Sequence, residues 1–158
     1  MGAPVGTARP AASGAAEMRV TDLPPGCSLH RHLVRGDPRG KLVALEGGAQ
    51  VPFDIARVYY LYDTTPDVVR GHHAHLALRQ WLVCVSGSCR IILDDGHRRR
   101  NVLLDDPATG LLIDALIWRE MADFSPGAVL LVLASERYDE ADYIRDYERF
   151  RALVAAKG

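Results

Sequence analysis

Three histidines stand close together in the segment RGHHAHLALRQWLVCVSG, residues 70–87. His73 and His75 are two positions apart, so on a β-strand both side chains point to one face while His72 points to the other. Two imidazoles on an inner face are costly to bury unless they bind a metal, pair with polar groups or transfer protons. The pair therefore indicates a functional site. The other histidines lack such a context and are expected at the surface: His30, His32 and His97.

The spacing around the pair resembles the first motif of the cupin superfamily, which is His-x-His, four residues, Glu, six residues and Gly. Here the motif begins at His73 and ends at Gly87, with Gln80 in place of the glutamate. A second cupin motif supplies a further histidine from a later strand. The matching segment, IDALIWREM at residues 113–121, has no histidine, and Arg119 is the equivalent position.

These departures separate metal chemistry from proton chemistry. A metal cupin binds its ion with three histidines and a carboxylate, whereas this chain offers two histidines, Gln80 and Arg119. A guanidinium cannot be a ligand, and its charge opposes a divalent ion. We therefore expect no metal and no other cofactor, and we expect the two histidines to act as acid and base.

Strand-like runs must position this site. From Met18 to Ala134 short apolar or alternating runs are interrupted by turn residues at regular spacing, and Asp95-Gly96 is a strong hairpin signal. Many short strands of this kind indicate a sandwich or barrel. With the cupin resemblance, the fold class is all-β: a cupin jelly-roll β-barrel with a C-terminal α-helix.

Only the end of the chain has a helical pattern. From Asp139 to Ala156 apolar side chains recur at helical spacing, after an acidic start that suits a helix N-terminus. These side chains are expected to pack on the barrel: Tyr143, Tyr147, Phe150 and Val154. The expected organisation is a flexible tail over residues 1–17, a cupin barrel over 18–137 and a helical segment over 138–158.

Composition excludes several other classes. The chain has 158 residues, with 19 Lys and Arg against 20 Asp and Glu, and a net charge of −1 argues against a broad nucleic-acid-binding face. No run is long and apolar enough for a membrane span, and residues 1–16 lack the apolar stretch of a secretory signal. Three cysteines without metal-type spacing suit the reducing cytoplasm, which is the expected location.

Longer strings carry a narrower resemblance. The chain contains RGKLVALE (39–46), RVYYLYD (57–63), RGHHAH (70–75), LVCVSGSCRIILDDG (82–96), IWREM (117–121) and VLASERYDEADYIRDY (132–147). In this order they resemble the dTDP-4-keto-6-deoxyglucose 3,4-ketoisomerases, which are WxcM-like metal-free cupins. The resemblance covers residues 18–150. It departs at His72, where the family often has Phe, and Arg119 stands where members have either His or Arg.

The resemblance implies conversion of dTDP-4-keto-6-deoxy-D-glucose to the 3-keto sugar through an enediol. His75 is then the principal C–H base and acid, and His73 handles oxygen protons or orients the substrate, because imidazole exchanges protons near neutrality. Arg119 favours the gluco over the galacto product. The implied context is deoxyamino-sugar biosynthesis, and the implied assembly is a homodimer, with N-terminal strands exchanged between subunits.

Other side chains are expected to hold the substrate. On the strand at 57–61 either Arg57 and Tyr59 or Val58 and Tyr60 face inward, and the run itself does not decide; the resemblance favours the first pair. The expected substrate-binding residues are Arg57, Tyr59, Arg70, Gln80 and Arg119.

Three alternatives remain at this point. A metal-free 3,5-epimerase would use the same histidine base without moving the ketone. A metal cupin, such as a dioxygenase, would need a bound ion. A non-catalytic sugar-binding cupin would use the histidines for recognition alone.

Overall fold

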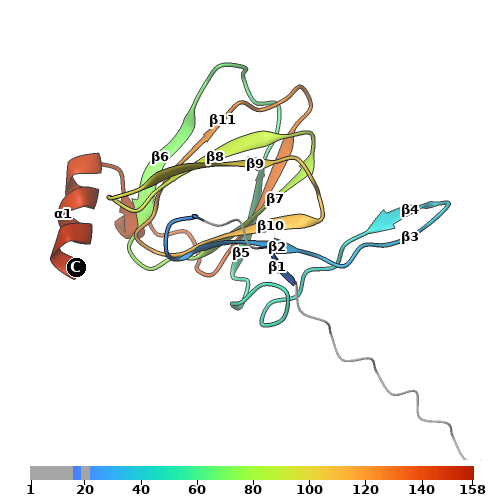
Figure 1. Cartoon of the computed structure of the whole chain (residues 1–158), viewed down its shortest axis with the longest axis horizontal. Coiled ribbons are helices and arrows are strands. Elements are labelled where there is room, and N and C mark those ends of the chain that lie inside the picture. Colours follow the sequence, from blue (N-terminus) through green and yellow to red (C-terminus); the bar gives the residue numbers. More distant parts are fainter. Residues whose placement is uncertain (1–15, 19–21) are drawn as a thin grey trace, which may run out of the picture.

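Two antiparallel sheets lie one above the other and enclose the main core (Figure 1). The computed structural model describes residues 16–18 and 22–158. The first sheet has the order β1 (Ala16–Met18), β2 (Cys27–Arg31), β10 (Thr109–Ile113), β7 (Gln80–Ser86), β12 (Val129–Ala134) and β5 (Arg57–Leu61). The second has the order β13 (Tyr143–Ile144), β6 (Arg70–His75), β11 (Trp118–Ala122), β8 (Cys89–Asp94) and β9 (Arg99–Leu104). The predicted all-β jelly-roll class with one C-terminal helix is confirmed.

Beyond the two sheets, a hairpin of β3 (Arg35–Asp37) and β4 (Gly40–Leu42) projects away from the body (Figure 1). The flexible tail expected over residues 1–17 lies outside the described residues as far as residue 15. Its last two residues, Ala16 and Glu17, instead pair with Arg31 and His30 of β2. That end of the prediction is wrong because the edge of β2 offers backbone partners.

Alternation along the strands builds the core between the sheets. On β8 the side chains of Cys89, Ile91 and Leu93 are fully buried, while those between them are partly exposed. The turn after β8 is the predicted hairpin. There Asp95 Oδ1 accepts hydrogen bonds from the backbone N–H groups of His97 and Arg98 at 2.8 and 2.6 Å, and Gly96 has a φ of 89°.

The predicted helix from Asp139 is wrong over its first half. Glu140–Asp142 form a single 3₁₀ turn, Tyr143–Ile144 form β13 against β6, and α1 spans only Tyr147–Lys157. Asp146 caps α1, because its side chain accepts a hydrogen bond from the N–H of Arg149 at 2.7 Å. Tyr143 therefore belongs to the sheet edge beside the histidines rather than to a helix face.

The helix packs on the outer face of β6. Phe150 is fully buried in a cluster with Ala74, Trp118 and Ile144. Ala74 lies between the two histidines in sequence and points to the opposite face of the strand. The helix thereby covers the strand that carries the histidine pair, and it fixes β13 beside it.

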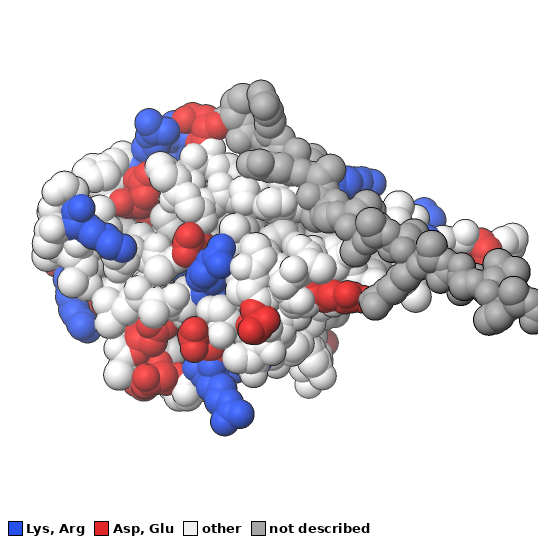
Figure 2. Space-filling model, turned by 90° about the horizontal axis from the view of Figure 1, so that it is seen from below, with Lys and Arg blue, Asp and Glu red and all other residues white. Residues whose placement is uncertain are grey.

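The surface shown in Figure 2 mixes both signs of charge. Blue and red side chains are interspersed over the described residues of that face, without a continuous basic area. Among the described residues no helix has the length and apolarity that crossing a membrane requires.

Candidate active site

The two histidines of β6 converge as the strand alternation predicts. His75 is fully buried and His73 nearly so, and their ring centroids lie 4.8 Å apart in an edge-to-face arrangement. His72 points away and is largely exposed, with a φ of 51°. Gly71 has a φ of 93°, and a Cβ there would lie 2.9 Å from the carbonyl oxygen of Arg119. Only glycine lets β6 and β11 approach this closely beside the pair.

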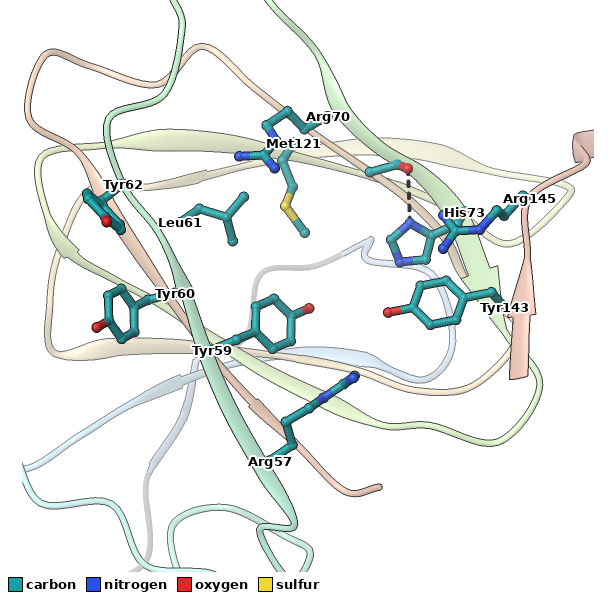
Figure 3. Close-up of a pocket in the computed structure, with 11 residues that line it drawn as sticks. Arg57, Tyr59, Tyr60, Leu61, Tyr62, Arg70, His73, Met121, Tyr143 and Arg145 are labelled. Carbon is teal, nitrogen blue, oxygen red and sulfur yellow. Dashed lines mark hydrogen bonds between the residues drawn. The ribbon is translucent and has the colours of Figure 1, made fainter. Parts of the chain in front are cut away.

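A cavity of about 570 Å³ opens beside His73 (Figure 3). Four of the predicted site residues line it: Arg57, Tyr59, Arg70 and His73. The other three, His75, Gln80 and Arg119, are fully buried and are not part of this lining. The remaining lining residues were not predicted as site residues: Tyr60, Leu61, Tyr62, Gly71, Met121, Tyr143 and Arg145.

Hydrogen bonds assign the same tautomer to both imidazoles. His73 Nδ1 lies 3.0 Å from the carbonyl oxygen of Gly71, and His75 Nδ1 lies 2.9 Å from Asp142 Oδ2. A carbonyl or carboxylate oxygen only accepts, so each Nδ1 carries the proton and donates it. The Nε2 atoms of both rings are buried without a partner in the described protein. Each Nε2 therefore keeps a free lone pair, as a general base requires.

Burial keeps both rings neutral. Desolvation, together with the positive charge of Arg119, lowers the pKa of His73 to about 4 and that of His75 to about 2. The carboxylate of Asp142 opposes this effect at His75, because a negative charge favours the imidazolium. At neutral pH both rings are bases without a proton on Nε2.

Stability should consequently fall as the pH drops below about 6.5. About 6.5 is the ordinary pKa of histidine, whereas the pKa of His73 in the folded chain is about 4. Between these two pH values the unfolded chain binds a proton at this residue and the folded chain does not. Each such group removes about 1.4 kcal/mol of unfolding free energy per pH unit in that window. Urea unfolding between pH 7 and pH 4.5 measures the slope. His73→Asn should make it shallower and the exposed His97→Asn should not; equal slopes in all three proteins would contradict the assignment.

A polar chain runs from the buried arginine to the cavity. Arg119 donates from Nη1 to Gln80 Oε1, and from Nε and Nη2 to the carbonyl oxygen of Ile117 at 3.2 and 2.6 Å. Gln80 Nε2 then donates to the hydroxyl of Tyr59 at 2.7 Å. Because that hydroxyl oxygen already accepts, its own proton is available to the cavity, and burial raises the pKa of Tyr59 so that the proton stays on.

Strand β5 presents Arg57 and Tyr59 inward, as the resemblance favoured, while Val58 and Tyr60 are exposed. Two guanidinium nitrogens of Arg57, Nε and Nη2, are buried without a hydrogen-bond partner among the described residues. The Arg57 guanidinium lies 5.3 Å from the ring centroid of Tyr59 and 5.6 Å from that of Tyr138. This leaves a cationic donor facing the cavity, suited to a phosphate or sugar oxygen.

Three further residues of the site come from the segment that the sequence pattern assigned to a helix. Asp142 binds His75, the Tyr143 ring centroid lies 4.4 Å from that of His75, and the Arg145 guanidinium lies 4.3 Å from the Tyr143 ring centroid. The hydroxyls of Tyr59 and Tyr143 point toward one another across the cavity (Figure 3). The signal available in the sequence was Asp142, an acidic residue in the segment that leads into the helix.

The prediction that the remaining histidines lie at the surface holds only for His97. His32 is buried and accepts a hydrogen bond from Trp81 Nε1 at 3.3 Å, because both pack on the outer face of the first sheet. His30 is half-buried, within 2.7 Å of the Ser28 hydroxyl.

The donor set does not fit a divalent metal ion. At the four positions that metal cupins use, this chain has His73, His75, Gln80 and Arg119. Gln80 Oε1 is already occupied by the Arg119 guanidinium, which remains charged even though burial lowers its pKa to about 10. A buried cation at this place repels a second one.

Comparison with known proteins identifies a family and several relatives. The family described as FdtA, WxcM-like, C-terminal, matches residues 25–155. A TDP-4-oxo-6-deoxy-alpha-D-glucose-3,4-oxoisomerase of Aneurinibacillus thermoaerophilus is 52% identical over 119 residues, which cover 75% of this chain and 86% of that protein.

Two solved structures are also similar. A TDP-quinovose 3,4-ketoisomerase of Campylobacter jejuni is 49% identical with a TM-score of 0.78, covering 81% of this chain and 98% of that one. A variant of the 3,4-ketoisomerase QdtA from Thermoanaerobacterium thermosaccharolyticum, in complex with TDP-4-keto-6-deoxyglucose, is 41% identical with a TM-score of 0.84, covering 85% and 98%.

Proposed function

We propose that the chain, which belongs to the FdtA (WxcM-like, C-terminal) family, is an isomerase. It converts dTDP-4-keto-6-deoxy-D-glucose to dTDP-3-keto-6-deoxy-D-glucose. The observation that carries the proposal is a pair of adjacent buried imidazoles whose Nε2 atoms lack a partner among the described residues; His73 lines the cavity, and His75 lies directly behind it. Two bases and a phenolic donor are the groups that movement of a ketone by one carbon requires.

His75 is assigned the C–H step. Its Nε2 takes the proton from C3, which is acidified by the neighbouring C4 ketone, and the C–H electrons form the C3–C4 double bond of an enediolate. The His75 imidazolium then delivers a proton to C4, and the O3 hydroxyl loses its proton as the carbonyl forms at C3. O4 keeps the proton that it received from Tyr59, and Tyr59 is reprotonated by the proton that leaves O3. Asp142 beside His75 supports the choice, because its carboxylate stabilises the imidazolium formed in between.

Tyr59 is assigned to the oxygen that becomes negative. Its hydroxyl accepts from Gln80 and so has its own proton to donate toward O4 as the enediolate forms. His73 lines the cavity and has a neutral carbonyl as its Nδ1 partner. We assign it to proton movement between the two sugar oxygens or to orienting the sugar.

Cationic side chains around the cavity are assigned to the nucleotide diphosphate. Arg57 offers two unpartnered guanidinium nitrogens, and Arg70 lines the cavity from the start of β6. Guanidinium groups suit paired phosphate oxygens because two parallel N–H groups can donate at once. We assign Gln80 and Arg119 an indirect role: Arg119 donates a hydrogen bond to Gln80, and Gln80 donates one to the Tyr59 hydroxyl.

The gluco configuration at C4 is the product we favour. Arg119 supports it, and so does the 49% identity to a TDP-quinovose ketoisomerase, since quinovose is 6-deoxyglucose. The 3-keto product is a substrate for amination, so deoxyamino-sugar biosynthesis in the cytoplasm is the proposed context.

Turnover tests the proposal directly. Substrate carrying ¹³C at C4 is incubated with the protein and a chelator, and ¹³C NMR follows the carbonyl resonance. We expect the label to lose its carbonyl shift as the ketone moves to C3, and the proton couplings at C4 then report the gluco or galacto configuration. A carbonyl that stays at C4 would refute ketoisomerisation.

A homodimer is the proposed assembly. The β3–β4 hairpin extends away from the sheets (Figure 1). The apolar side chains of Leu33 and Leu42 at its ends are exposed. Exposed apolar side chains on a projecting hairpin suit burial against a second copy. Light scattering should give twice the mass of the 17.3 kDa chain, and Leu42→Asp should shift it toward the monomer. A monomeric mass for the unaltered protein would contradict the proposal.

A further inference from the structure

The segment between the barrel and α1 carries a carboxylate bonded directly to the innermost histidine. Asp142 Oδ2 accepts from His75 Nδ1 at 2.9 Å, and the Asp142 side chain is only 16% exposed. His75 has no exposure at all. A carboxylate placed on the far side of a buried imidazole from its free nitrogen determines which nitrogen carries the proton.

Asp142 is itself held from several directions. Its second oxygen, Oδ1, accepts from the N–H of Ala77 at 2.8 Å, and its carbonyl oxygen accepts from the N–H of Leu76 at 2.9 Å. The 3₁₀ turn that contains it is capped by Asp139, whose side chain accepts from the N–H of Ala141 at 3.0 Å. With both oxygens occupied, the carboxylate cannot rotate away from His75 without breaking its hydrogen bond to the N–H of Ala77, just after β6.

The surroundings of His75 disfavour the imidazolium that forms when the ring accepts a proton. Arg119, His73, Arg57 and Arg145 all act to lower its affinity for a proton. Asp142 is the negative charge in direct contact with the ring. A base in such a cationic setting needs a counter-charge to accept a proton from carbon.

We infer that Asp142 is a positioning residue for the reaction: it fixes His75 in the Nδ1–H tautomer, directs the Nε2 lone pair toward the substrate and stabilises the imidazolium. The expected effect on kcat rests on the proposed function, whereas the expected Nδ1–H tautomer of His75 does not. The Asp142 carboxylate contacts His75 and the backbone of Ala77, so we assign it to act through His75 and not on the sugar.

The variant Asp142→Asn tests this. An amide can donate to Nδ1 and so supports the other tautomer. We therefore expect kcat to fall by up to about 10⁴-fold, as when a carboxylate that orients a catalytic imidazole is replaced by an amide, with KM within about twofold. Long-range ¹H–¹⁵N spectra of the ¹⁵N-histidine-labelled protein, with His75 assigned by its loss in His75→Asn, should show Nδ1–H in the unaltered protein and Nε2–H in Asp142→Asn. The exposed Asp105→Asn is the matched control and should change neither.

Several results would overturn the inference: an Nε2–H tautomer at His75 in the unaltered protein, an unchanged tautomer in Asp142→Asn, or a kcat for that variant within threefold of the original. If Asp142→Asn does not fold, the tautomer of the unaltered protein still decides. If the unaltered protein shows no ketoisomerase activity, the proposed function fails alone, and the tautomer spectra still judge Asp142.

Discussion

Replacing His75 by asparagine should abolish ketone transfer, with kcat reduced by about 10⁴-fold, the upper range for loss of a general acid–base group. Asparagine retains polarity and approximate size but cannot accept a proton from carbon. The buried Nε2 of His75 without a protein partner, and the Asp142 carboxylate on its other nitrogen, are the reasons to expect the full effect. A quenched time course with NMR detection of the 3-keto product measures it.

The neighbouring His72 supplies a matched control on the same strand. Its side chain is 55% exposed, points away from the cavity and has a φ of 51°, a conformation that asparagine tolerates well. His72→Asn should therefore retain activity within about twofold. Turnover by His75→Asn above about a tenth of the original rate would remove His75 from the C–H step.

Phe150→Ala should have the largest effect on stability, lowering the free energy of unfolding by about 3–5 kcal/mol. The ring is fully buried against Ala74, Trp118 and Ile144, so its loss leaves a cavity between α1 and the outer face of β6. Urea unfolding at pH 7.5, followed by tryptophan fluorescence, measures the change.

The comparison for Phe150 is a large apolar side chain in solvent. Leu103 on β9 is 55% exposed, and Leu103→Ala should cost less than about 0.5 kcal/mol. A loss below about 1 kcal/mol for Phe150→Ala would mean that the helix does not anchor β6. In that case the placement of Asp142 would need another source of rigidity.

Local patterns were sufficient where one strand sets the geometry. The alternation of His73, Ala74 and His75 follows from the two-residue period of a strand, and the Asp95-Gly96 turn follows from local chemistry. The inward face of β5 could not be read in this way, because the residues on both of its faces are apolar or amphipathic. The family resemblance supplied that choice.

The errors arose where distant segments meet. Tyr143 and Ile144 fit a helical repeat, but pairing with β6 stabilises an extended backbone that no local pattern reveals. Asp142 looked like part of an acidic helix start, and its bond to His75, 67 residues earlier in the chain, exists only in the folded chain. His32 is likewise buried only because Trp81 of another strand packs against it.

Isotope exchange during turnover in heavy water tests the central claim most directly. The protein, a chelator and dTDP-4-keto-6-deoxy-D-glucose are combined in heavy water, and proton NMR locates the deuterium. The account requires that the ketone moves to C3 and that deuterium appears at C4 of the product. Deuterium at C5 with the ketone still at C4 would show an epimerase instead. A ketone that stays at C4 with no deuterium at any carbon would contradict the histidine acid–base chemistry.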